Sequence, residues 1–158
     1  MPNRLYAYNN RVSGDRTIGA VELTLIKVAD RRLGATERVK LADGEVVLSS
    51  TRARTLVDAV YDWSRFDTLP RAFGWIRAEL RAGRVEAEEL VRLTLRFADV
   101  GAMRRIGAVL ARLGVEERLL VQLERALRPS TSLISWIPTR PKRGSADRRW
   151  GIVWNDSD

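Results

Sequence analysis

The spacing of apolar residues changes near residue 49, and this change limits the possible fold more than any other feature. Between residues 17 and 29 apolar and polar side chains alternate, as in a strand with one buried face. The segments 37 to 41 and 45 to 49 are also strand-like, and the Ala-Asp-Gly turn between them predicts a hairpin. From Ser49 onward apolar residues recur at steps of three and four, which is typical of helices. We therefore expect strands before residue 50 and helices after it.

Five helices are expected in the middle of the chain. Ser49 or Ser50 can cap the first helix, and Gly83 and Gly114 can end the second and the fourth in the left-handed conformation. The expected ranges are approximately 50 to 63, 68 to 83, 87 to 98, 102 to 114 and 116 to 128.

Two further strands, 133 to 137 and 150 to 154, follow the helices, and we expect them to return to the N-terminal sheet. The turn-rich segment 8 to 19 is either a loop or an edge strand. The predicted fold class is α+β, with a mostly antiparallel sheet of N-terminal and C-terminal strands packed on a bundle of four to five helices. A single domain, 1 to 158, is expected because no linker or repeat interrupts the pattern.

The chain has no Cys and no His, which excludes disulfides, thiolate nucleophiles and proton transfer by imidazole. Two groups of residues are candidates for a metal site. Asp58 and Asp62 share a helix face, and Glu-Arg-Val-Lys at 37 to 40, near Asp30, has the acids and the lysine of some nuclease sites. No acid pair with a following lysine forms a convincing metal site, however. No glycine-rich phosphate loop is present. We therefore expect a protein that is not an enzyme and has no cofactor or bound metal, with a metal-dependent nuclease as the least favoured alternative.

The net charge of +8 favours a partner of negative potential: a nucleic acid, a nucleotide or an acidic protein surface. Only three of the 28 cationic residues are lysine, so the surface carries mainly planar guanidinium donors suited to phosphates and carboxylates. No apolar stretch is long enough to span a membrane, and the first residues lack the apolar run of a secretory signal. We expect a cytoplasmic protein without membrane contact.

The strongest candidate binding segment is 140 to 149, where five cations stand against one acid, Asp147. Three tryptophans flank it: Trp136, Trp150 and Trp154. Cations interleaved with aromatic rings suit stacked bases on a phosphate backbone, or an anchor patch for a protein. The alternative is a mobile basic loop whose tryptophans belong to the core of two strands. The five cations are Arg140, Lys142, Arg143, Arg148 and Arg149.

Two further features concern the helices. Arg104 and Arg105 lie at the start of the fourth helix, where the helix dipole disfavours cations, so they are either binding residues or partners of another element. Gly107, inside the same helix, predicts the close approach of another backbone. In the first helix Arg54 precedes Asp58 by four residues, which predicts a solvated ion pair on the polar face.

Several of these segments, in this order and spacing, resemble the C-terminal domain of the AbiEi family, the antitoxins of type IV abortive-infection toxin-antitoxin systems. The resemblance covers about residues 8 to 155. It rests on YNNRVSG at 8 to 14, VVLSSTRARTLVDAVYDW at 46 to 63, MRRIGAVLARLG at 103 to 114 and RRWGIVWN at 148 to 155. The matching positions, which we interpret mainly as determinants of the fold while Arg104 and Arg105 stay candidates for binding, are Arg54, Thr55, Asp58, Arg104, Arg105, Gly107, Trp150 and Asn155.

The resemblance implies a protein that counteracts a nucleotidyltransferase-like toxin, and in many members also represses its own operon. Family members usually begin with a winged-helix DNA-binding domain, and nothing of that kind precedes Tyr8. We therefore expect a part of a longer protein, a stand-alone antitoxin domain, or a relative with another role. The expected partner is the cognate toxin or its nucleic-acid substrate. A module that binds DNA or RNA through residues 140 to 149 is the main alternative.

Overall fold

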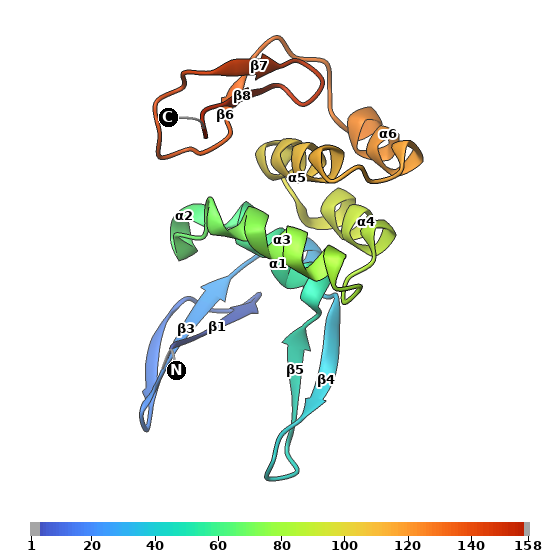
Figure 1. Ribbon diagram of the computed structural model, residues 1–158. Coiled ribbons are helices and arrows are strands. Elements are labelled where there is room, and N and C mark those ends of the chain that lie inside the picture. Colours follow the sequence, from blue (N-terminus) through green and yellow to red (C-terminus); the bar gives the residue numbers. More distant parts are fainter. Residues whose placement is uncertain (1–3, 157–158) are drawn as a thin grey trace. The chain divides into compact units, whose positions relative to one another are not determined.

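The computed structural model describes residues 4 to 156, and in this range the chain has an α+β fold (Figure 1). It divides into two compact units, residues 1 to 35 and residues 36 to 158, at a position where the sequence pattern gave no boundary. The described range contains six α-helices, one short 3-10 helix and three small sheets.

The N-terminal unit is a three-stranded sheet in the order β1-β3-β2. Strand β1 (Arg4–Asn9) runs parallel to β3 (Val21–Lys27), while β2 (Gly14–Ile18) runs antiparallel to β3. The strand predicted at 17 to 29 is thus divided by a turn at residues 19 and 20, and β2 is an edge strand within the turn-rich segment. A 3-10 helix, Asp30–Arg32, follows β3.

The predicted hairpin is confirmed at the start of the larger unit. Strand β4 (Thr36–Lys40) pairs in antiparallel register with β5 (Val46–Ser50), and Val39 lies opposite Val47. All residues of both strands are exposed except the half-buried Ser50. The alternating pattern therefore specifies the pairing but not a buried face.

The helices follow the predicted order with small shifts at their ends. Helix α1 is capped by the Thr51 hydroxyl, which accepts a hydrogen bond from the Arg54 amide at 3.3 Å. Ser49 and Ser50 cannot serve as caps because they still belong to β5. Gly83 and Gly114 have φ angles of +62° and +70° behind their helices, as predicted. The helices are α1 (Arg52–Tyr61), the unpredicted short α2 (Trp63–Phe66), α3 (Arg71–Arg81), α4 (Ala87–Phe97), α5 (Val100–Arg112) and α6 (Glu117–Ala126).

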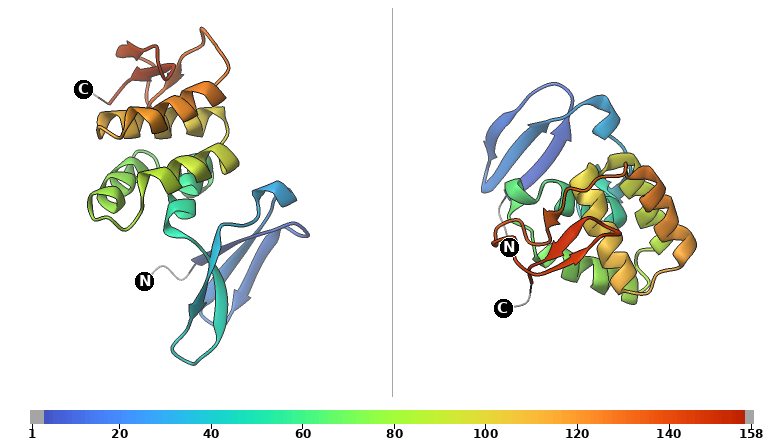
Figure 2. Two further views of the ribbon diagram at one scale, coloured as in Figure 1. Left: turned by 90° about the vertical axis from the view of Figure 1, so that its right-hand side faces the viewer. Right: turned by 90° about the horizontal axis from the view of Figure 1, so that it is seen from above.

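Helix α5 is the centre of the larger unit. It contacts α1, α3, α4 and α6, and every residue from Ala102 to Leu110 is buried. In Figures 1 and 2 it lies between the C-terminal sheet on one side and α1 on the other, which explains why its polar positions are covered as well. Its first turn is capped by the Asp99 carboxylate, which accepts from the Ala102 amide at 2.7 Å.

The C-terminal strands form a sheet of their own, in the order β6-β8-β7. This corrects the prediction that they return to the N-terminal sheet, since no pairing of that kind occurs among residues 4 to 156. Strand β6 (Ile134–Ser135) is parallel to β8 (Ile152–Trp154), and the unpredicted β7 (Ser145–Asp147) is antiparallel to it. None of the helices in the described range has the length and apolar character needed to cross a membrane.

Candidate binding surface

The ion pair between Arg54 and Asp58 is confirmed, but it is not solvated. Arg54 Nε donates to Asp58 Oδ2 at 2.7 Å, and Arg54 is only 1% exposed. The guanidinium also lies over the Phe97 ring, 3.7 Å from its centroid. Thr55 is exposed and donates its hydroxyl to the Thr51 carbonyl at 3.1 Å. Arg54 of this family-like motif is thus part of the core rather than of a surface.

Arg104 and Arg105 are also buried, which corrects their interpretation as surface binding residues. Arg105 donates to the backbone carbonyls of Ser135 and Trp136, at 2.9 and 3.2 Å, and Arg104 donates to the Ser132 carbonyl at 3.0 Å. Burial lowers the pKa of Arg105, and the nearby Asp99 carboxylate opposes this effect. The two cations therefore attach the chain around β6 to helix α5. This is the second of the two interpretations, in which they are partners of another element of the fold.

Gly107 marks a close approach, although not the approach of a backbone. A Cβ atom at this position would stand 2.2 Å from Cζ3 of Trp150, which is fully buried. The indole ring thus occupies the notch that the missing side chain leaves on α5. Two residues of separate family-like motifs, 43 positions apart in the sequence, form one contact between α5 and the C-terminal sheet.

Asn155 holds the start of the basic segment in place. Its carboxamide oxygen accepts from the Ile137 amide at 2.8 Å, and its nitrogen donates to the carbonyls of Ile137, Arg140 and Pro141 at 3.0 to 3.2 Å. Asn155 itself is 4% exposed. The chain from 137 to 141 is therefore fixed by one buried side chain.

The five cations of segment 140 to 149 do not all have the same role. Arg149 binds two carboxylates of α6, Glu117 at 2.5 Å and Glu124 at 3.1 Å, and the hydrogen bond that it donates to Glu117 raises the pKa of Arg149. Lys142 is exposed and donates to the Leu133 carbonyl. The exposed cations other than Arg149, which we call the basic face, are Arg140, Lys142, Arg143 and Arg148.

The tryptophans next to this segment belong mainly to the core. Trp136 and Trp150 are 4% and 1% exposed, and only Trp154 is half-buried. Trp136 stacks on Phe73 of α3 with ring centroids 3.8 Å apart. Because stacking on a base needs an accessible ring face, Trp136 and Trp150 are closed to bases in this structure. The aromatic part of the predicted nucleic-acid platform is therefore absent at these two positions.

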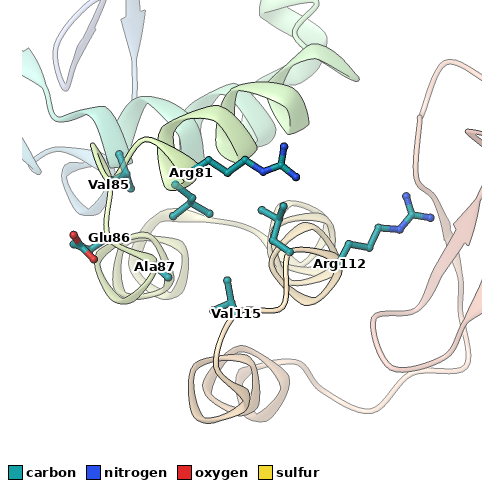
Figure 3. A pocket seen from close by; sticks show the side chains of 9 residues that line it. Arg81, Val85, Glu86, Ala87, Arg112 and Val115 are labelled. Atoms are coloured by element: carbon teal, nitrogen blue, oxygen red, sulfur yellow. The ribbon is translucent and has the colours of Figure 1, made fainter.

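A second cationic site, which the sequence analysis missed, lies between α3 and α5. We call it the α3–α5 groove. Its cavity measures about 340 Å³ and adjoins a second one of about 380 Å³ with which it shares Arg81, Arg112 and Leu113. Figure 3 shows the side chains of Arg81 and Arg112 extending in the same direction from the two helices. The lining residues of the groove are Phe73, Arg77, Arg81, Val109, Arg112, Leu113 and Trp136.

The signal for this groove was present in the sequence. Phe73, Arg77 and Arg81 follow one another at four-residue steps, which places them along one helix face. What the sequence did not contain was the partner helix that brings Arg112 to the same face.

Within residues 4 to 156, no cluster of three or more acidic side chains suits a metal ion. Asp58, which the nuclease alternative requires, is engaged by Arg54. Comparisons of the chain with protein-family models, curated proteins and solved structures found no match. The resemblance to the AbiEi family therefore stays a prediction, and we infer function from the arrangement of the chain's own residues.

Proposed function

We propose that the chain is a non-enzymatic antitoxin domain of the AbiEi type, which counteracts a nucleotidyltransferase-like toxin in the cytoplasm through its basic face. Two features support this proposal. Gly107 and Trp150, from two of the family-like motifs, meet in a buried contact, and Arg54 and Asp58 form a buried ion pair within a third, as expected for positions that maintain a common fold. The cations of the basic face lie outside these buried contacts.

The observation that carries the proposal is that contacts with the rest of the fold fix both ends of the segment that bears the basic face. Asn155 fixes the backbone at Arg140, and the Arg149 ion pairs with Glu117 and Glu124 tie the far end of the segment to α6. Between these two points, Lys142 donates to the Leu133 carbonyl. A surface that is ordered before binding loses less conformational entropy when the partner arrives. A segment whose two ends are fixed therefore presents its cations to an acidic partner at a lower cost in backbone entropy.

The same geometry favours a protein partner over a single-stranded nucleic acid. Sequence-tolerant binding of single strands combines cations with accessible aromatic rings, and the rings of Trp136 and Trp150 are buried. A duplex bound through its phosphates needs no stacking, so it remains the alternative that the experiment must separate.

The test is growth rescue from the product of the gene adjacent to this one. We would compare the parent chain with a basic-face variant carrying Arg140→Gln, Lys142→Gln, Arg143→Gln and Arg148→Gln. Arg149 is kept because its ion pairs belong to the fold. A matched control, with the same loss of four charges from exposed helical and helix-flanking positions, carries Arg92→Gln, Arg96→Gln, Arg125→Gln and Arg128→Gln.

We expect the parent and the control to restore growth, and the basic-face variant to fail while keeping the circular dichroism spectrum of the parent. If both variants restore growth, the basic face is not the antitoxin surface. If the neighbour is not toxic, or the parent does not rescue, the antitoxin proposal is wrong. Binding to duplex DNA that weakens steeply with salt would then support the nucleic-acid alternative.

A further inference from the structure

The α3–α5 groove contains an excess of positive charge that the fold does not neutralise. Arg77 and Arg81 have no ionic or hydrogen-bond partner among residues 4 to 156. They stand four residues apart on one helix face, where two like charges destabilise a helix. Arg112 adds a third guanidinium from α5. Arg77 and Arg81 are exposed, so the repulsion between them is small, and an anion bound in the groove would relieve it.

The acidic residues nearest in sequence to Arg77 and Arg81 do not neutralise these arginines. Glu79, on α3 between the two arginines, accepts two hydrogen bonds from Arg84 at 2.8 and 3.0 Å, and this pairing lowers the pKa of Glu79. Glu86 lines the adjoining cavity, but in Figure 3 its side chain points away from Arg81 and Arg112. The chain thus has carboxylates close to the groove and uses them for other contacts.

Arg112 is held in a fixed position. It donates to Asp156 at 2.9 Å, and its guanidinium lies over the Trp154 ring, 3.3 Å from the centroid. A guanidinium has five N–H donors, so one bond to Asp156 leaves donors for a ligand. The side chain is therefore ordered before a ligand binds, while Arg77 and Arg81 supply charge that is not compensated.

The number of arginines and the shape of the site indicate the class of ligand. One carboxylate carries a single charge and is satisfied by one guanidinium fork, whereas linked phosphates carry several charges and enough oxygens for three forks. Beside these exposed charges the groove offers apolar side chains, from Phe73, Val109 and Leu113, for contact with the rest of a ligand. A cavity of about 340 Å³ also has the size of a small-molecule site.

We propose that the α3–α5 groove binds a ligand with two or more linked phosphate groups, held by Arg77, Arg81 and Arg112. Two sources share this chemistry: an inorganic polyphosphate and a nucleoside triphosphate. The proposal is independent of the antitoxin function, because none of the three arginines belongs to the basic face.

The test is calorimetric titration of the full chain with inorganic pyrophosphate, tripolyphosphate and ATP at constant ionic strength. Citrate serves as an anion with several carboxylates and no phosphate. The groove variant carries Arg77→Gln and Arg81→Gln. The control carries Arg92→Gln and Arg96→Gln, a pair with the same spacing and charge on the exposed side of α4, outside both cavities.

We expect the parent and the control to bind the phosphates, and the groove variant to bind at least about tenfold more weakly, because hydrogen bonds to charged groups are lost. Without ligand, the groove variant should unfold at the same temperature as the parent or higher, since a repulsion has been removed. Tighter binding of ATP than of tripolyphosphate would identify a nucleotide, and equal binding would identify the phosphate chain alone.

Three results would overturn the proposal. One is the absence of binding by the parent. Another is an equal loss in the groove variant and the control, which would mean unspecific attraction to net charge. The last is binding of citrate as tight as that of pyrophosphate, which would exclude selectivity for phosphate.

Discussion

The N-terminal unit and the helices of the larger unit each contain a close arginine–carboxylate pair, and the two pairs lie in opposite surroundings. Arg4 and Glu22 join β1 to β3 at 2.5 Å, with side chains that are 54% and 56% exposed. Arg54 and Asp58 are joined at 2.7 Å within α1, with side chains that are 2% and 9% exposed. The distances are similar, yet water screens the first pair and not the second.

The same contrast applies to apolar side chains. Of the described residues of the N-terminal unit, only Ile26 and Arg32 are buried, and Leu5 and Ile18 are 59% and 64% exposed. In α5, by comparison, nine consecutive residues are buried. In the N-terminal unit the alternating apolar residues form a paired sheet, but pairing of the strands does not by itself bury their apolar side chains. Most of the stability of this chain therefore comes from the helices and the C-terminal sheet.

The largest expected difference between the two regions is in hydrogen exchange. Amides of β3 should exchange through local openings of low free energy, because little buried apolar surface is lost when the strands separate. Amides in the centre of α5 should exchange only upon global unfolding, at a free energy about 5 kcal/mol or more higher. Residue-resolved exchange measured by NMR checks this. Equal protection in β3 and α5 would mean that the N-terminal sheet is covered in solution.

Removal of one acid from each pair should have unequal effects. Asp58→Ala leaves the Arg54 charge buried without its carboxylate and should lower the free energy of unfolding by about 3–5 kcal/mol. Glu22→Ala removes an exposed partner and should leave the unfolding midpoint of the helices unchanged. Urea denaturation followed at 222 nm measures both. Similar losses in the two variants would contradict the division between a buried and a screened pair.

Two helical glycines should respond with opposite signs. Gly107→Ala places a Cβ against the Trp150 ring and should cost about 1–3 kcal/mol through overpacking. Gly74→Ala, in α3, meets no atom within 4 Å and should stabilise the chain by about 1 kcal/mol through helix propensity. Thermal unfolding of the two variants compares them directly. A neutral Gly107→Ala would show that the ring and α5 can move apart without loss.

Much of the fold was predictable because it depends on local signals. The helix ranges follow from apolar spacing, and Gly83 and Gly114 closed their helices as expected. The grouping of strands into separate sheets was not predictable, because the alternation in a strand does not specify which strand it joins. β7 was missed since Ser145–Asp147 is short and polar and gains its place by pairing with β8.

The candidate sites were predicted less well than the fold. Periodicity placed Arg54 on a polar arc, but Phe97 of another helix covers it. Arg104 and Arg105 appeared to be surface cations because their acceptors are backbone carbonyls about 30 residues later, which no side-chain pattern reveals. The α3–α5 groove depends on two helices meeting, so Arg112 carried no signal of its own. Asn155 was selected through the family resemblance, and its contacts give a physical reason for its place in that motif.

The contact of Trp150 with Gly107 also has a consequence for the order in which the chain matures during synthesis. Helix α5 leaves the ribosome well before residues 132 to 155, so the Gly107 notch and the guanidiniums of Arg104 and Arg105 first face solvent. They are covered only when the indole and the carbonyls around β6 emerge. Until that moment α5 displays an apolar notch beside two cations whose carbonyl acceptors have not yet emerged, a surface that the finished protein hides.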